Sequence, residues 1–146
     1  MPQPQIPGAP QYRPGSPEAR ELFRQAAATA GLPVAWADSA GLHNILARES
    51  QGFVGRPNYT YGERARAVAR WPEVWTELRA GTITAKSSAT GLGQLILRNV
   101  DAYYPNGRQG IGHALAEAVG MLRYIKARYG TPDEAWRQYG KHHEGY

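Results

Sequence analysis

The chain has 146 residues, a formal net charge of +5 and no cysteine. This length fits one domain that folds without a covalent staple, and the lack of cysteine excludes disulfides, thiol catalysis and cysteine zinc sites. The longest uncharged run, residues 25–37, is too short to span a bilayer, and we expect no signal peptide at the N-terminus. The basic residues form no block of five like charges, so charge alone selects no acidic partner.

Six of the eleven prolines lie in residues 1–17, which we expect to be an extended, polyproline-like tail or linker. The globular part starts at residues 16–18, where a serine N-cap precedes a proline and an acid. Apolar residues at helical spacing predict a helix over residues 18–30, ended by Gly31.

A second helix is expected to begin at Asp38 or Ser39 and to close at Gly52. Residues 54–62 are expected to form a loop, and residues 63–70 a helix. Pro72 then breaks that helix and opens a short one to Ala80, followed by a polar connection over residues 82–90.

One or two helical pieces are expected over residues 91–104, ended by the turn Pro105-Asn106-Gly107. The clearest helix follows, with an apolar stripe from Leu115 to Tyr129 and Gly130 as its stop. Thr131 caps a last helix that ends at Gly140. Strand patterns are nearly absent, so the predicted class is mainly α.

Glu49 stands out on the second helix. It lies four positions after Ile45 and seven after Leu42, so it projects from the buried face, in the last turn where the helix dipole disfavours an anion. Both effects raise the pKa of a carboxyl group, and a protonated carboxylic acid can act as a general acid. The alternative, which spacing alone favours, is a helix-end glutamate that turns to solvent or pairs with Arg48.

Four segments resemble, in order, the motifs of lytic transglycosylases with the lysozyme-like fold. They are ARESQGF at 47–53, similar to E-S-G-F; SSATGLGQ at 87–94, similar to S-G-A-x-G-L-M-Q; EAVGMLRYIKARYG at 117–130, similar to the third motif; and AWRQYG at 135–140, similar to A-x-x-x-Y-N-x-G. The ordered set covers most of residues 42–140. The sequence as a whole resembles transglycosylase domains carried by bacteriophage tail or virion proteins.

The resemblance makes Glu49 the sole catalytic acid/base. It implies that Gln94 hydrogen-bonds substrate amide or hydroxyl groups, and that Ser87, or Ser88 if the loop is one residue shorter, takes the family's serine position near the acid. Tyr139 matches a tyrosine that lies beside the catalytic glutamate in the family. By spacing alone, Gln94 could cap a backbone group and Tyr139 could be a core aromatic.

The resemblance also implies a lysozyme-like fold for residues 18–146, with a helical core and a small variable lobe inserted after the catalytic helix. That lobe corresponds to residues 54–84. We expect Tyr59 and Tyr61 to lie nearer the substrate, as stacking surfaces for sugars, than the tryptophans of the lobe, whose spacing with Leu78 favours a core role.

The implied reaction cuts the glycosidic bond between N-acetylmuramic acid and N-acetylglucosamine in peptidoglycan and leaves 1,6-anhydro ends. It needs one carboxylate. Among the other acids, Asp38, Glu63, Asp133 and Glu134 are explained as cap or first-turn residues, and Asp101 and Glu144 have no partner pattern. No cofactor is expected. No metal is expected either, because the histidines (His43, His113, His142 and His143) lack ligand spacing.

Three alternatives stay open. A lysozyme would share the acid motif but hydrolyse with water. A non-catalytic wall-binding or virion structural module is conceivable because Gly93 and Gly140 replace the family's usual methionine and asparagine. A nucleic-acid-binding protein has no recognition motif in its favour. The favoured setting is virion-associated or delivered to the periplasm or cell wall, with residues 1–17 binding another assembly protein.

Overall fold

The computed structural model describes residues 11–141, and these residues are helical with no β-strand. The seven α-helices of this range are α1 (Pro17–Ala30), α2 (Ala40–Glu49), α3 (Glu63–Arg66), α4 (Trp71–Arg79), α5 (Leu97–Tyr103), α6 (Ala114–Tyr129) and α7 (Pro132–Gln138). Short 3₁₀ helices span Val34–Asp38, Tyr59–Tyr61, Val68–Arg70 and Gly107–Gly110. The prediction of a mainly α protein is confirmed.

Local capping chemistry fixes where three of the helices begin. The Ser16 hydroxyl accepts a hydrogen bond from Ala19 N at α1, and the Ser39 hydroxyl accepts one from Leu42 N at α2. Thr131 caps α7 in the same way. Each cap satisfies a backbone N–H that has no partner within its own helix, so these starts follow from the sequence alone.

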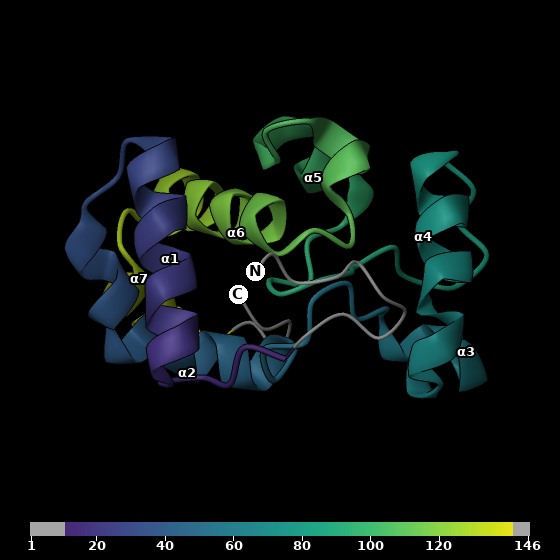
Figure 1. Cartoon of the computed structure of the whole chain (residues 1–146), viewed down its shortest axis with the longest axis horizontal. Coiled ribbons are helices and arrows are strands. Elements are labelled where there is room, and N and C mark those ends of the chain that lie inside the picture. The colour runs from purple at the N-terminus through teal and green to yellow at the C-terminus, as the bar shows by residue number, and fades with distance from the viewer. Residues whose placement is uncertain (1–10, 142–146) are drawn as a thin grey trace.

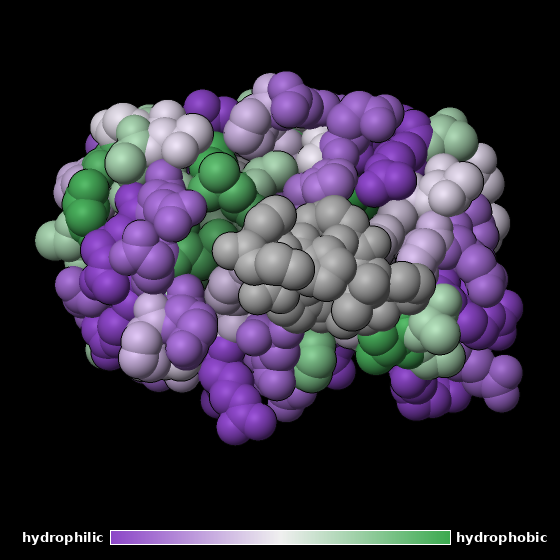
Figure 2. All heavy atoms as spheres, viewed as in Figure 1, coloured by the Kyte–Doolittle hydropathy of each residue, from purple (hydrophilic) through white to green (hydrophobic). Residues whose placement is uncertain are grey.

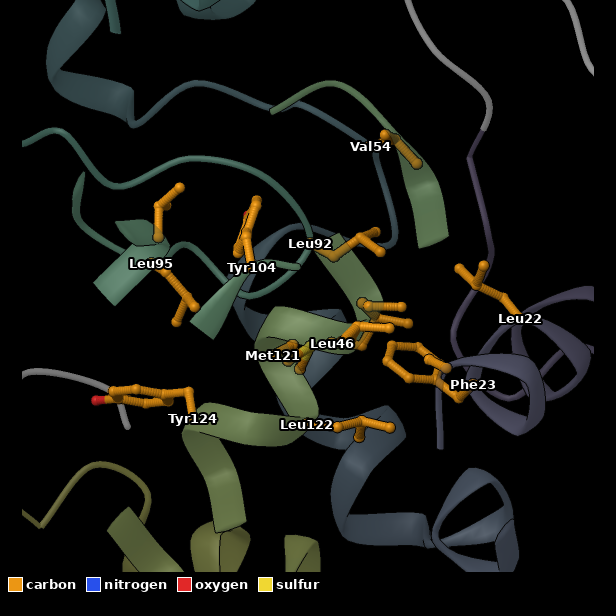
Figure 3. Close-up of a cluster of buried hydrophobic side chains, with 14 of the residues drawn as sticks. Leu22, Phe23, Leu46, Val54, Leu92, Leu95, Tyr104, Met121, Leu122 and Tyr124 are labelled. Carbon is orange, nitrogen blue, oxygen red and sulfur yellow. The ribbon is translucent and has the colours of Figure 1, made fainter. Parts of the chain in front are cut away.

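The hydrophobic core is built around α6, which packs against α1, α5 and α7, while α2 packs against α7. Figure 3 shows Phe23 of α1 and Leu46 of α2 converging on Met121 and Leu122 of α6. All four side chains are fully buried. Burial of this kind stabilises the helices more than their own propensity does.

Helices α3 and α4 form a separate group at the far end of the molecule from α1 and α7 (Figure 1). This lobe follows α2 directly in the chain. Trp71, Trp75 and Leu78 are buried, so the core role expected for Trp75 is confirmed. The Trp75 ring also lies against Gly112, which is outside the lobe. The long connections on either side of the lobe run back to the main helices through the middle of the molecule.

Three predicted helices have different bounds in the structure. The helix expected over residues 63–70 is interrupted at Ala67, whose backbone is extended. The helix expected over residues 91–104 begins only at Leu97, because a turn over the preceding residues places Gln94 at φ 52°. The second helix ends at Glu49 rather than near Gly52.

The apolar stripe of α6 also needs a correction. Leu115, expected on the buried stripe, is 40% exposed, and Glu117 is fully buried instead. The buried face of this helix therefore includes Glu117, a carboxyl group that the predicted stripe left out.

Residues 11–17 pack against the body of the protein. Tyr12 N donates to Gly52 O at 2.8 Å, and Gly15 N donates to His43 Nδ1 at 2.8 Å. The part of the predicted tail that the structure describes is therefore docked beside the end of α2, whereas residues 1–10 lie outside the described residues. Figure 2 shows a mainly hydrophilic face over the described residues in this view. None of the described helices combines the length and apolar character needed to cross a membrane.

Candidate active site

Two adjoining pockets meet at Glu49 and together form what we call the groove. The small pocket has a volume of about 260 Å³ and is bordered by the lobe through Gly62 and Ala65. The large pocket has a volume of about 590 Å³ and reaches α5 and α6. Four residues line both pockets: Arg48, Glu49, Tyr59 and Gln94. Glu49 therefore lies at the middle of a groove that continues on both sides of it.

Glu49 is the last residue of α2, and its side chain is half-buried. Burial raises the pKa of its carboxyl group, because a charged carboxylate loses solvation in the protein. The hydrogen bond from Tyr139 acts in the opposite direction and lowers this pKa, but burial is the larger effect. Glu49 is the only acidic side chain that lines either pocket in residues 11–141.

Tyr139 lies directly beside Glu49, as expected. Its hydroxyl donates a 2.6 Å hydrogen bond to Glu49 Oε2, across 90 residues of sequence. Its ring is tilted against Trp136, with the ring centroids 5.3 Å apart. Burial, and after it the pairing with Glu49, raises the pKa of Tyr139 well above its ordinary value, so the phenol stays a hydrogen-bond donor. One carboxylate oxygen is thereby held in place, and the other can face the groove.

Gln94 is held with its amide in one orientation. Its Nε2 donates to Arg56 O at 2.7 Å and to Gly91 O at 3.0 Å. Since two carbonyl oxygens require two N–H donors, the amide oxygen must be the atom directed away from them. Gln94 can therefore offer an acceptor to a hydroxyl or amide N–H of a ligand in the groove.

The other four expected binding residues divide into two groups. Ser87 and Tyr59 line the large pocket, and the Tyr59 side chain is 83% exposed. Ser88 is buried, and its hydroxyl accepts a hydrogen bond from Leu97 N at the start of α5. Tyr61 is buried beneath Arg64 and lines neither pocket. Of the two serines only Ser87 lines the groove, and of the two tyrosines only Tyr59 does. Ser88 and Tyr61 contribute to the packing of the loops instead.

Sequence spacing missed Glu117, a second carboxyl group removed from water. It is fully buried on α6 and accepts three backbone hydrogen bonds, from Gly55 N and Leu92 N at 2.9 Å and from Gly112 N at 2.8 Å. These donors belong to three different loops. Glu117 therefore ties the segment that follows α2 to the segment that carries Gln94.

The buried position of Glu117 also explains a glycine of the second motif. Gly91 has φ 82°, and a Cβ there would lie 2.6 Å from Glu117 Oε1. Burial raises the pKa of Glu117 to about 7, while its three backbone donors lower it. One signal could have pointed to Glu117: it precedes Met121, which is buried, by four positions on the same helix.

His43 has a structural role. His43 is buried, its Nε2 contacts Ala37 O at 2.7 Å, and its Nδ1 accepts from Gly15 N. Burial lowers the pKa of His43, which favours the neutral ring that this pattern requires. No group of three or more potential metal ligands occurs among the described residues; His142 and His143 lie outside them.

Comparisons with known proteins do not assign the chain to a family. No family model matches it, and no curated protein and no solved structure gives a significant match. What the groove does must therefore be argued from its own chemistry.

Proposed function

We propose that the protein is a lytic transglycosylase that cleaves peptidoglycan glycan strands, with Glu49 as its single acid/base. The observation that carries the proposal is the isolation of Glu49: a half-buried carboxyl group with a raised pKa, at the middle of the groove. The ordered motif resemblance supports the lysozyme-like fold and the substrate class. Gln94, Ser87 and Tyr59 supply the polar and aromatic surfaces that a glycan strand requires.

A single carboxylate favours this reaction over two-carboxylate hydrolysis. Most glycosidases place a second carboxylate about 5–9.5 Å from the first, on the opposite side of the scissile bond. In the described residues neither pocket contains one. Glu117 cannot take that role, because it is fully buried and both of its oxygens are engaged by backbone N–H groups.

In the proposed reaction, protonated Glu49 gives its proton to the glycosidic oxygen, and the bond to C1 of N-acetylmuramic acid breaks. The acetamido oxygen of the same sugar stabilises the cation at C1. The Glu49 carboxylate then accepts the proton of the C6 hydroxyl, and the C6 oxygen bonds to C1. Atoms balance without water, metal or cofactor, and Glu49 ends protonated for the next cycle.

The test is cleavage of purified cell walls by the wild type and by Glu49→Gln. Glutamine preserves size and can still accept the Tyr139 hydrogen bond, but it cannot donate a proton to the glycosidic oxygen. We expect a loss of about 10²–10⁴-fold in rate. Because burial disfavours the charged carboxyl, the variant should be at least as thermally stable as the wild type at pH 7. Glu18→Gln, on the exposed part of α1, is the matched control.

Three results would refute the proposal. Cleavage by Glu49→Gln within a few-fold of the wild type would remove Glu49 from the chemistry. Mass spectrometry of the products separates the two reactions, because anhydro ends lack one water. New reducing ends in their place would identify a lysozyme of the same architecture. A stable wild type that binds walls and releases no fragments would identify a non-catalytic module.

A further inference from the structure

The groove is lined by an excess of arginine. Arg48 borders both pockets, Arg56 and Arg66 border the small pocket, and Arg98 and Arg128 border the large one. Against these five cations stands one carboxyl group, Glu49, whose burial favours its neutral form. A groove of this charge is suited to an anionic ligand.

These arginines differ from most of the others that the structure describes. Six arginines outside the groove are ion-paired, among them Arg20 with Asp38, Arg64 with Glu77 and Arg108 with Asp101. Arg79 and Arg123 donate to backbone carbonyl oxygens instead. In residues 11–141 none of the five groove arginines makes an ion pair with a carboxylate. Their charge is therefore available to a ligand rather than consumed within the fold.

Arg128 is held in position over the large pocket. Its guanidinium lies 5.9 Å from the ring centroid of Tyr124 and 5.6 Å from that of Tyr129, and it donates to Tyr124 Oη at 3.1 Å. These contacts orient the planar group without neutralising it. Arg98 reaches the same pocket from the first turn of α5, so two guanidinium groups from different helices border one cavity.

We propose that Arg98 and Arg128 bind carboxylates of the peptide stems attached to the glycan strand. This inference rests on the proposed function. In a peptidoglycan strand, the carboxyl of each lactyl group on N-acetylmuramic acid is joined to a peptide stem through an amide bond. The sugars are then neutral, and the negative charges lie on the carboxylates of the stems. Guanidinium groups bind carboxylates through paired N–H donors. The enzyme is therefore expected to prefer stem-bearing strands with free carboxylates.

The test compares two preparations of one wall, native and with its carboxylates converted to methylamides by a carbodiimide and methylamine. The proteins are the wild type, the double variant Arg98→Gln/Arg128→Gln, and Lys126→Gln, an exposed control on α6 that borders neither pocket. Two partly exposed charge contacts at roughly threefold each give about a tenfold higher half-saturating wall concentration for the double variant on native walls. On methylamidated walls it should match the wild type.

Binding is measured separately from cleavage, by co-sedimentation with walls in the Glu49→Gln background. If the double variant is weakened equally on both walls, or on neither, the carboxylate proposal is overturned. Loss of wall binding by Lys126→Gln to the same extent would also overturn it, because any basic residue would then suffice. If Glu49→Gln itself cleaves walls, the proposed function fails while the binding comparison still tests the arginines.

Discussion

The buried Glu117 predicts an unusual pH dependence of folding stability. Its pKa is raised from 4.5 to about 7 in the folded protein, so the native state binds a proton that the unfolded state releases. The stability contributed by this group is fully present below pH 4.5 and is lost as the pH rises to about 7. A pKa difference of this size corresponds to about 3 kcal/mol of unfolding free energy.

Replacing Glu117 with glutamine removes the titration. The amide oxygen of glutamine can still accept from Gly55 N and Leu92 N, but its NH₂ group then faces Gly112 N, a donor against a donor. An unsatisfied buried donor costs about 1–3 kcal/mol at every pH. We therefore expect Glu117→Gln to be less stable than the wild type at pH 4.5. By pH 8 the difference should move by about 3 kcal/mol in favour of the variant, so that the variant is then at least as stable as the wild type.

Urea unfolding followed by circular dichroism at pH 4.5, 6, 7 and 8, at constant ionic strength, measures this gap directly. Glu49 titrates in both proteins, so its contribution cancels in the difference. For the exposed control Glu18→Gln, the gap to the wild type should stay nearly constant. A constant gap for Glu117→Gln would refute the reasoning, because it would mean that three backbone donors keep Glu117 ionised throughout.

Two further predictions follow from contacts around the groove. Tyr139→Phe removes the hydrogen bond that lowers the pKa of Glu49, so the alkaline limb of the wall-cleavage profile should move to higher pH; an unchanged limb would contradict this. Gly91→Ala should cost more than about 2 kcal/mol in urea unfolding, because its Cβ would collide with Glu117, whereas Gly107→Ala, also at positive φ but in open space, should cost about 1 kcal/mol. Equal costs would show that the carboxylate contact is unimportant.

Features decided by neighbouring residues could be predicted from the sequence. The caps at Ser16, Ser39 and Thr131 each depend on a hydroxyl and a backbone N–H three residues apart. Ser16 and Thr131 were predicted as caps, and the second helix was expected to begin at Asp38 or Ser39. The stop at Gly130 is similar, since its φ of 92° disfavours any other residue. Local chemistry of this kind leaves few alternatives.

Features decided across the fold could not be predicted. The turn before α5 depends on Glu117 accepting from Leu92 N, a contact between residues 25 positions apart. Ser88 and Tyr61 were expected at the groove from their places in the sequence, but the packing of α5 and of the lobe removes them from it. Periodicity describes a face of one element and does not say what covers that face.

Some features of the candidate site are decided by neighbouring residues, and others are decided across the fold. The position of Glu49 on its helix follows from spacing, and the structure agrees in the direction of its pKa shift. The contact with Tyr139 was expected only from the resemblance, because nothing in the intervening 90 residues specifies it. The arginine lining of the large pocket was not predicted, since its members come from α2, α5 and α6 and share no pattern in the sequence.

The fold keeps two carboxyl groups away from water and gives them different surroundings. Glu117 has three backbone donors and no access to solvent, so it can order the loops but cannot exchange a proton with a ligand. Glu49 has one donor, from Tyr139, and a groove on either side. Environment therefore divides the two roles: one acid holds the loops that shape the groove, and the other is left with a raised pKa where a scissile bond would lie. Although neither pocket contains a second carboxylate in residues 11–141, Glu49 keeps the raised pKa that the proposed function requires of its single acid.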